Sequence, residues 1–254
     1  MILLFGGTSE GKRLAALLAS HGLAYTYSTK ERTDFVASSL CRYRQGPLTA
    51  DALVDLCMRE GVRILLDGSH PFAADLHKTL AEAGRRLEIP VLRFERHCDS
   101  PINHEGVLYL EGWDQALEYL RKGRIERLLA LTGIQSIAKL KSHWETHETW
   151  FRILPRPESL ETARRLGLSE RFILPGLPSQ DPEEEIALIR KLGIEALITK
   201  ESGHTGGLPA KIKAAQACRI PILILRRPPL PESFAVTYSE ADLMAGVTKV
   251  LTWT

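Results

Sequence analysis

A glycine-rich turn at residues 6–11 is the part of the chain whose residue types point most directly to chemistry. It reads Gly-Gly-Thr-Ser-Glu-Gly, follows the apolar run 2–5 and precedes a helical pattern. Small residues at such a turn let the backbone approach a pyrophosphate, and the amides and positive dipole of the helix N-terminus attract it. Thr8 replaces the middle glycine of G-x-G-x-x-G, and Glu10 would either repel a phosphate or bond a ribose hydroxyl. The turn predicts a nucleotide loop, with a ligand-free tight turn as the alternative, and its candidate residues are Gly6, Gly7, Thr8, Ser9 and Glu10.

Hydroxyl and basic side chains follow the second expected strand, at residues 24–27. In a dinucleotide-binding fold this position meets the adenosine ribose, where an acid is typical of NAD and a basic residue accommodates the 2′-phosphate of NADP. Ser28, Lys30 and Arg32 therefore favour NADPH, with NADH still possible. A solvated surface loop is the alternative for each residue, because Lys and Arg are mostly exposed.

A polar turn at residues 67–72 reads Asp-Gly-Ser-His-Pro-Phe and lies between another expected strand and helix. Parallel strands end at the same sheet edge, so Gly68 and Ser69 are expected near the cofactor. His70 has a side chain that can donate or accept a proton there. A loop histidine tied to the backbone is the alternative.

A second glycine-rich turn spans residues 200–211 and reads Lys-Glu-Ser-Gly-His-Thr-Gly-Gly-Leu-Pro-Ala-Lys. A helix N-terminus flanked by two lysines indicates an anion site. The turn lacks G-x-x-x-x-G-K-[ST], so it is not a P-loop, and a long capping loop is the alternative. Its candidate ligand-binding residues are Lys200, Ser202, Gly206, Gly207 and Lys211.

Other kinds of site have little support in the sequence. His143 and His147 are four residues apart, but no third metal ligand is near and H-E-x-x-H is absent, so we expect a surface pair and no metal. The four cysteines form no C-x-x-C pair, which predicts reduced thiols. No G-x-S-x-G elbow of a serine hydrolase occurs.

The composition is that of an ordinary globular protein. The 254 residues are 44% hydrophobic and 25% charged, with a net charge of +2, which gives no reason to expect nucleic-acid or membrane-surface binding. No apolar run is long enough to span a membrane, and Met1 leads into an apolar strand without a signal peptide. We therefore expect a cytoplasmic protein.

Short apolar runs alternate with helical patterns along the whole chain, which is typical of parallel α/β units. The aperiodic stretch 95–106 is a candidate linker. We expect an α/β fold of two Rossmann-like lobes with mainly parallel sheets and a cleft between them. The predicted domains are a cofactor-binding domain at 1–98 and a substrate domain at 99–254.

Several segments together resemble one known family, the precorrin-6A reductases of cobalamin biosynthesis, including the cobalt-precorrin-6A reductases. The resemblance covers nearly the whole chain. The segments, in order, are Gly6–Gly11, Asp67–Ala73, Leu92–Arg96, Leu131–Gly133, Leu154–Pro157 and Lys200–Lys211.

The resemblance implies a two-lobed Rossmann-like enzyme that uses a reduced nicotinamide cofactor to reduce one double bond of the macrocycle, giving precorrin-6B or its cobalt form. Gly6, Gly7, Thr8 and Glu10 then fall at the family's cofactor loop, and Ser28 and Arg32 at its second-strand turn. The family often reads Ala-Gly-Arg-Thr there, whereas this chain has Lys-Glu-Arg-Thr at 30–33. Residues 133–136 depart from the expected Gly-Ser-Lys, so a substrate lysine is either missing or replaced by Lys139.

An anionic tetrapyrrole substrate carries acetate and propionate groups, which arginines bind in bidentate fashion. A proton must accompany the hydride, from His70, Lys200 or water. We expect a monomer or small homo-oligomer. The alternatives are a non-catalytic two-lobed module that binds a nucleotide or anion, and a methyltransferase-like enzyme; the basic second-strand turn favours a phosphorylated dinucleotide over an adenosyl sulfonium. The candidate substrate residues are Arg93, Arg96, Lys139, Arg156, Ser202, Gly206, Gly207 and Lys211.

Overall fold

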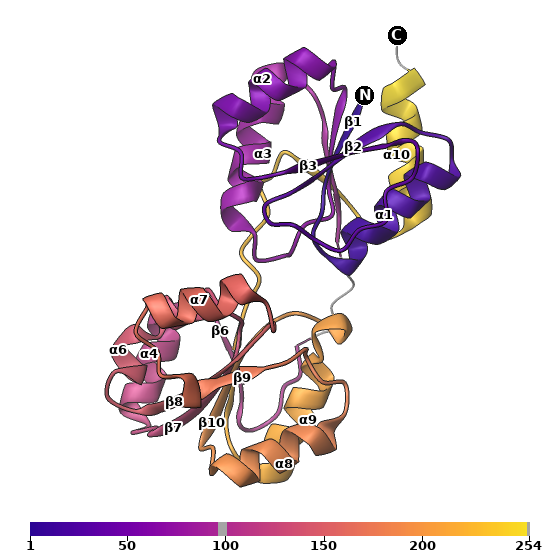
Figure 1. Ribbon diagram of the computed structural model, residues 1–254. Coiled ribbons are helices and arrows are strands. Elements are labelled where there is room, and N and C mark those ends of the chain that lie inside the picture. Colours follow the sequence, from indigo (N-terminus) through magenta and orange to yellow (C-terminus); the bar gives the residue numbers. More distant parts are fainter. Residues whose placement is uncertain (96–100, 253–254) are drawn as a thin grey trace. The chain divides into compact units, whose positions relative to one another are not determined.

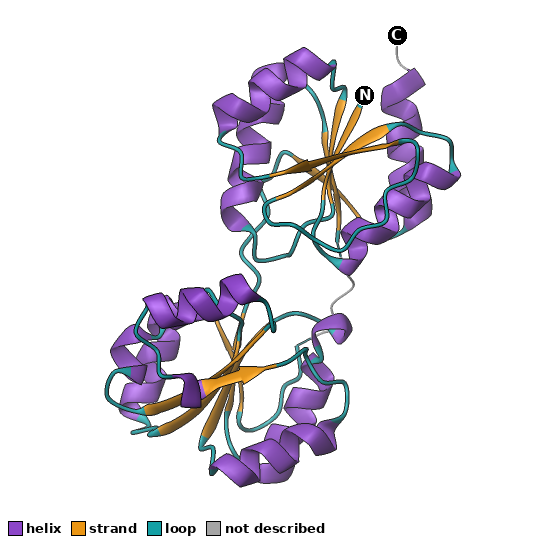
Figure 2. Ribbon diagram, in the orientation of Figure 1, coloured by secondary structure: helices purple, strands orange, loops and turns teal. Residues whose placement is uncertain are grey.

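The chain folds into two α/β units, and the computed structural model describes residues 1–95 and 101–252 (Figure 1). Unit 1 comprises Met1–His97 and Pro228–Thr254, and unit 2 comprises Cys98–Arg227. Each unit is built on a six-stranded sheet whose paired strands are parallel. Helices cover both faces of each sheet (Figure 2), so the strands are buried on both sides, as parallel sheets require.

The sheet of unit 1 has the strand order β12-β5-β4-β1-β2-β3. The order reverses between β1 and β4, because the chain runs outward from β1 in one direction and from β4 in the other. In chain order the strands are β1 (Ile2–Phe5), β2 (Tyr25–Thr29), β3 (Cys41–Gln45), β4 (Ile64–Asp67), β5 (Val91–Phe94) and β12 (Phe234–Thr237).

Two helices cover each face of this sheet. Leu14 of α1 (Ser9–Ser20) and Leu243 of α10 (Glu240–Thr252) belong to one buried cluster. Leu53 of α2 (Ala50–Glu60) and Leu80 of α3 (Ala74–Leu87) belong to the other. The sheet therefore separates two apolar cores.

The sheet of unit 2 has the order β6-β11-β10-β7-β8-β9 and reverses between β7 and β10. Its strands are β6 (Val107–Leu110), β7 (Arg127–Leu131), β8 (Glu148–Ile153), β9 (Ile173–Pro175), β10 (Ala196–Lys200) and β11 (Ile222–Leu225). Its α-helices are α4 (Trp113–Lys122), α5 (Ser136–Lys139), α6 (Lys141–Trp144), α7 (Pro157–Arg165), α8 (Pro182–Leu192) and α9 (Leu208–Cys218). Two short 3-10 helices, η1 (Glu170–Phe172) and η2 (His204–Gly206), complete the unit.

Capping residues fix the ends of several helices. Thr8 and Thr49 cap α1 and α2 by accepting backbone N–H hydrogens. Asp181 caps α8, Pro182 occupies its first turn, and Gly193 ends it in the left-handed conformation.

The carboxyl-terminal segment corrects the predicted domain division. The sequence assigned residues 228–254 to the second domain, but they return to unit 1. Phe234 pairs with Val91, so β12 extends the first sheet beyond β5. Because β12 pairs with a strand that is distant in the sequence, no local pattern predicts that the carboxyl-terminal segment belongs to unit 1.

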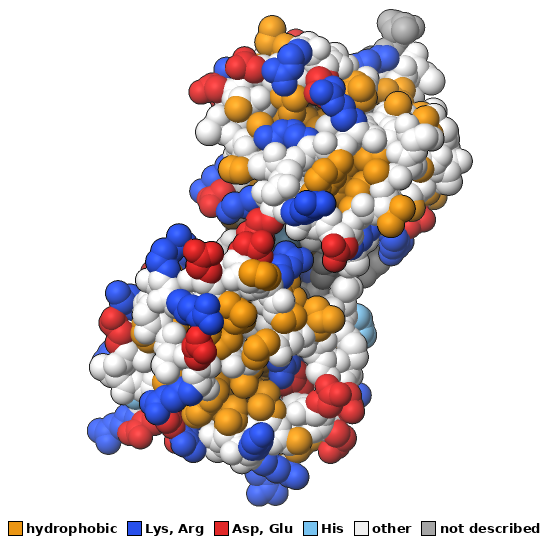
Figure 3. Space-filling model, viewed as in Figure 1, with side chains coloured by type: hydrophobic (Ala, Val, Ile, Leu, Met, Phe, Trp, Pro, Cys, Tyr) orange, Lys and Arg blue, Asp and Glu red, His pale blue; other side chains and the backbone are white. Residues whose placement is uncertain are grey.

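Among residues 1–95 and 101–252, no helix is long and apolar enough to cross a membrane. In the same part of the chain, no group of three or more His, Cys, Asp or Glu side chains is arranged to hold a metal ion. Basic and acidic side chains are mixed over the face shown in Figure 3, in keeping with the small net charge.

Candidate functional site

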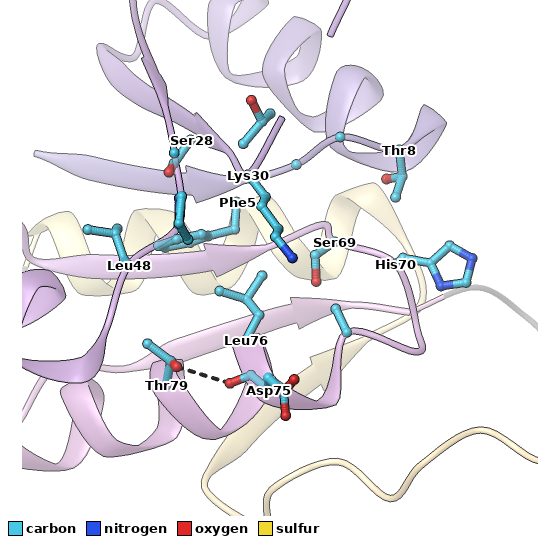
Figure 4. Close-up of a pocket in the computed structure, with 16 residues that line it drawn as sticks. Phe5, Thr8, Ser28, Lys30, Leu48, Ser69, His70, Asp75, Leu76 and Thr79 are labelled. Atoms are coloured by element: carbon cyan, nitrogen blue, oxygen red, sulfur yellow. Dashed lines mark hydrogen bonds between the residues drawn. The ribbon is translucent and has the colours of Figure 1, made fainter. Parts of the chain in front are cut away.

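A pocket of about 300 Å³ lies at the carboxyl ends of the strands in unit 1, beside the point where the strand order reverses (Figure 4). Ligands of open α/β sheets bind at such switch points. The turns after β1, β2, β3 and β4 and the start of α3 form its wall. The lining residues are Phe5, Gly6, Gly7, Thr8, Ser28, Thr29, Lys30, Gly46, Pro47, Leu48, Ser69, His70, Ala73, Asp75, Leu76 and Thr79.

The glycine-rich turn after β1 is held in place by close backbone contacts. A Cβ at Gly6 would overlap the Tyr27 ring, and a Cβ at Gly11 would lie 2.6 Å from the Gly6 Cα. Gly7 has a φ of +95°, which disfavours other residues, while a Cβ there would meet no atom within 4 Å. The open space at Gly7 and the close packing beneath Gly6 leave a bare backbone surface for a ligand.

Thr8 and Tyr27 fix this turn from opposite sides. The Thr8 hydroxyl donates to the Gly68 carbonyl at 2.6 Å and accepts from the Gly11 N–H at 2.9 Å. The Tyr27 hydroxyl accepts from the Gly7 N–H at 3.0 Å, and its ring stacks on Phe35 at 4.2 Å. Burial raises the pKa of Tyr27, so its hydroxyl stays protonated. The sequence singled out Thr8 but not Tyr27, because nothing local showed that the Tyr27 ring reaches the turn.

Ser9 and Glu10 follow the turn in the first helical residues of α1. The Ser9 hydroxyl donates to Glu10 Oε2 at 3.0 Å, and Glu10 is buried. Neither residue is part of the pocket wall, so their predicted contact with a cofactor stays a prediction.

The turn after β2 brings Ser28 and Lys30 to the pocket but not Arg32. Lys30 is exposed at the rim, and Ser28 is buried in the wall. The Ser28 hydroxyl accepts a hydrogen bond from Arg44 of β3 at 3.2 Å. Arg32 is exposed and lies outside the wall. Arg44 is a cation that the sequence did not single out, since only the β2–β3 pairing reveals its position.

The turn after β4 contributes Ser69 and His70 to the wall, and Gly68 supports the turn from behind. The His70 Nδ1 accepts from the Phe72 N–H at 3.1 Å, so the neutral ring carries its hydrogen on Nε2. His70 is thus both tied to the backbone and exposed at the pocket. The two interpretations offered by the sequence are compatible.

The predicted substrate residue Arg93 is instead a buried structural cation. Its side chain donates to Asp67 Oδ2 at 2.9 Å and to the Ser69 carbonyl at 2.9 Å, and pairs with Glu95 at 3.1 Å. Only 1% of Arg93 is exposed. Asp67 also lies 3.4 Å from His77 Nε2, and burial lowers the pKa of His77. The network holds the turn that carries His70, and the contact of Arg93 with a substrate stays a prediction.

The second glycine-rich turn lies at the switch point of unit 2, after β10 and beside the turn after β7. Lys200 ends β10 and is half-buried, and this burial lowers its pKa. Ser202 is buried against Gly206, where a Cβ would overlap its side chain. Gly207 has a φ of +68° and packs under the Ser179 carbonyl. Both glycines are therefore required by packing, and their contact with a substrate stays a prediction.

Lys211 is also a buried cation. Its amine is buried and donates to the Gly206 carbonyl at 2.7 Å and to Thr199 Oγ1 at 3.2 Å. Burial lowers its pKa to about 8. The amine ties the glycine-rich turn to β10, and its contact with a substrate stays a prediction.

The remaining candidates differ in how far the structure describes them. Lys139 is exposed at the end of α5, and Arg156 is half-buried at the N-cap of α7, after β8. Arg96 lies outside the described residues. Among the other arginines at strand ends, Arg152 forms an ion pair with the buried Glu185.

Unit 1 thus combines the strand order of dinucleotide-binding folds with a bare glycine turn at the first helix N-terminus. These features define a Rossmann-type nucleotide-binding unit. The backbone surface at Gly7 and the cations near Ser28 fit the pyrophosphate and ribose end of a nicotinamide dinucleotide.

Comparisons with known proteins agree on one family. The family model described as Precorrin-6x reductase CbiJ/CobK matches residues 1–253. The cobalt-precorrin-6A reductase of Methanothermobacter thermautotrophicus is 30% identical, with 98% of this chain and 84% of that protein covered. The precorrin-6A reductase of Rhodococcus erythropolis is 31% identical, with 97% and 96% covered. The solved structure "CobK precorrin-6A reductase" shares the fold, with a TM-score of 0.79 at 22% identity over 98% of this chain and 96% of that one. The chain belongs to the precorrin-6x reductase family.

Proposed function

We propose that the chain reduces one carbon–carbon double bond of precorrin-6A or its cobalt form in cobalamin biosynthesis, with NADPH as reductant. Family membership over residues 1–253 is the observation that carries this proposal, and it makes the chain an oxidoreductase that uses a nicotinamide cofactor. In the balanced reaction a hydride and a proton add across the double bond, and NADPH is oxidised to NADP⁺.

The pocket of unit 1 is the proposed cofactor site. The bare backbone at Gly6 and Gly7 and the positive end of the α1 dipole would adjoin the pyrophosphate. Ser28 and Lys30 would meet the adenosine ribose, and the turn after β2 offers a hydroxyl and a cation where NAD-binding folds usually have an acid. This favours NADPH over NADH. When bound, the cofactor supplies the hydride, and the protein supplies orientation and charge.

The carboxyl edge of the sheet in unit 2 is the proposed site for the carboxylates of the macrocycle. Lys200 ends β10, Arg156 follows β8, and Lys139 ends α5, the short helix after β7. Arginine and lysine bind carboxylates through charge-assisted hydrogen bonds. Arg96, which the sequence also singles out for the substrate, lies outside the described residues, and its role stays a prediction.

His70 is the proposed proton donor. It lies on the β4 side of the pocket, and its imidazolium form would give up one ring proton and return to the neutral ring, in which Nδ1 accepts from the Phe72 N–H. Lys200 is the second candidate, because its lowered pKa eases loss of a proton.

The test is anaerobic turnover with purified precorrin-6A and with its cobalt form, each with NADPH and with NADH. We expect NADPH-dependent loss of nicotinamide absorbance and a product two hydrogens heavier by mass spectrometry. Nucleotide binding without turnover of either macrocycle would contradict the reductase and favour a binding module.

A further inference from the structure

Arg44 places a guanidinium directly behind the ribose end of the pocket. Ser28 and Arg44 are register partners in the β2–β3 pair. The guanidinium donates to Ser28 Oγ at 3.2 Å, to the Gly46 carbonyl at 2.6 Å and to the Pro47 carbonyl at 3.2 Å. All three partners line the pocket. The cation is therefore anchored to the wall at three points.

The charge of Arg44 is not paired with a carboxylate among the described residues. Its three hydrogen-bond partners are neutral oxygens. Arg44 is half-buried, and this burial lowers its pKa although the charge of Glu60 acts in the opposite direction. Glu60 itself pairs with Arg42 at 3.2 Å. A partly desolvated cation without an anion is costly, so an anionic ligand at this wall would be stabilised.

The Ser28 hydroxyl is oriented by the same contact. Because its oxygen accepts from Arg44, its own hydrogen can be donated to a different acceptor. Ser28 lies at the carboxyl end of β2, where dinucleotide-binding folds contact the ribose 2′ position. A phosphate there would accept the Ser28 hydrogen and sit close to the Arg44 charge, with Lys30 at the rim.

We propose that Arg44, and not Arg32, sets the preference of the pocket for a 2′-phosphorylated nucleotide. Arg44 is a positioning residue that orients Ser28 and gives the wall its positive charge. Arg32 is exposed outside that wall. The inference rests on the proposed use of a nicotinamide dinucleotide.

The test is a set of equilibrium titrations of the full chain with NADPH, NADH, 2′,5′-ADP and ADP. Wild type should bind NADPH and 2′,5′-ADP more tightly than their 2′-hydroxyl counterparts. Arg44→Met should weaken both 2′-phosphorylated ligands by roughly 10–100-fold, the range of a charge-assisted hydrogen bond, and the other two by less than about threefold. Arg44→Lys should keep part of the preference, because it keeps the charge but loses the three-point anchorage.

Two further variants test whether the change in ligand preference is specific to Arg44, and not a result of losing any nearby positive charge or of misfolding. Arg42→Met removes a cation two residues away on the same strand and should change the NADPH to NADH affinity ratio by less than about twofold. Ser28→Ala should lower NADPH affinity several-fold with Arg44 in place. Thermal unfolding of each variant checks that the chain is folded.

Equal weakening of all four ligands in Arg44→Met would overturn the inference, since it would show only a structural role. A large loss of preference in Arg32→Ala with none in Arg44→Met would also overturn it. So would wild-type binding that is indifferent to the 2′-phosphate. Failure of the reductase function gives a different result: 2′,5′-ADP is still preferred and still depends on Arg44, but neither macrocycle is turned over.

Discussion

Replacement of Arg93 by Met separates a substrate-binding role from a structural one. The Arg93 side chain contacts the carboxylates of Asp67 and Glu95, and all three side chains are buried. Met keeps much of the side-chain volume but leaves both carboxylates without their cation. Removing one partner of a buried ion pair typically costs about 3–5 kcal/mol, because the remaining charge stays buried.

The expected loss is large on the scale of domain stability. At roughly 3–5 °C per kcal/mol for a unit of this size, the midpoint of the unfolding transition of unit 1 should fall by roughly 10–25 °C. Scanning calorimetry measures this shift, and urea titration gives the free energy of unfolding. Arg42→Met is the matched control, because the Arg42 side chain is 72% exposed and its ion pair with Glu60 should be worth only about 0–1 kcal/mol.

Substrate kinetics complete the comparison. If the Arg93→Met variant kept the wild-type unfolding midpoint and instead had a higher KM for the macrocycle, the structural role would be refuted. A double variant, Asp67→Asn with Arg93→Met, should recover part of the lost stability, because it removes one of the two uncompensated charges.

Three further predictions concern other parts of the chain. His70→Asn should lower kcat by about 100-fold or more while leaving the Kd for NADPH unchanged, as expected for loss of a proton donor; an unchanged kcat in rapid-mixing kinetics would favour Lys200 or water. Burial and the neighbouring His147 lower the pKa of His143 to about 4. The unfolded chain therefore binds a proton below pH 6.5 that the folded chain does not, and stability should fall from pH 6.5 towards pH 4 by roughly 2–3 kcal/mol. His143→Gln should reduce this slope in urea titrations at several pH values, and an identical slope would contradict the assignment. Gly6→Ala should destabilise unit 1 by about 1–3 kcal/mol, because its Cβ meets the Tyr27 ring, whereas Gly7→Ala should cost only about 1 kcal/mol of backbone strain; thermal unfolding measures both, and the reverse ranking would be inconsistent with the packing at Gly6.

The sequence predicts the strand ends and helix starts well, because the signals that determine them are local. The apolar run before Gly6, the start of α1 at Ser9 and the start of α8 after Asp181 each depend on a few neighbouring residues. The glycine-rich turns are confirmed as turns between a strand and a helix for the same reason.

The fate of the charged side chains depends on distant partners and could not be predicted in this way. Arg93 is buried because Asp67, from the neighbouring strand β4, supplies its counter-charge. Lys211 is buried because the glycine turn that precedes it folds back over its amine. The position of an arginine near a strand end in the sequence therefore does not predict where its side chain points or whether it forms an ion pair with a buried carboxylate. Arg44 illustrates the opposite case, since a residue inside a strand donates hydrogen bonds to three residues of the pocket wall.

The two switch points explain why separate glycine-rich turns occur in one chain. In unit 1 the turns after β1 and β4 adjoin the reversal of strand order, and in unit 2 those after β7 and β10 do. Helices leave such neighbouring strands in opposite directions, so room for a ligand opens at the sheet edge without any insertion. A reductase must hold a dinucleotide and a macrocycle at once. Because each unit provides one such edge, substitutions at the β10 turn should affect the macrocycle and substitutions at the β1 turn the dinucleotide.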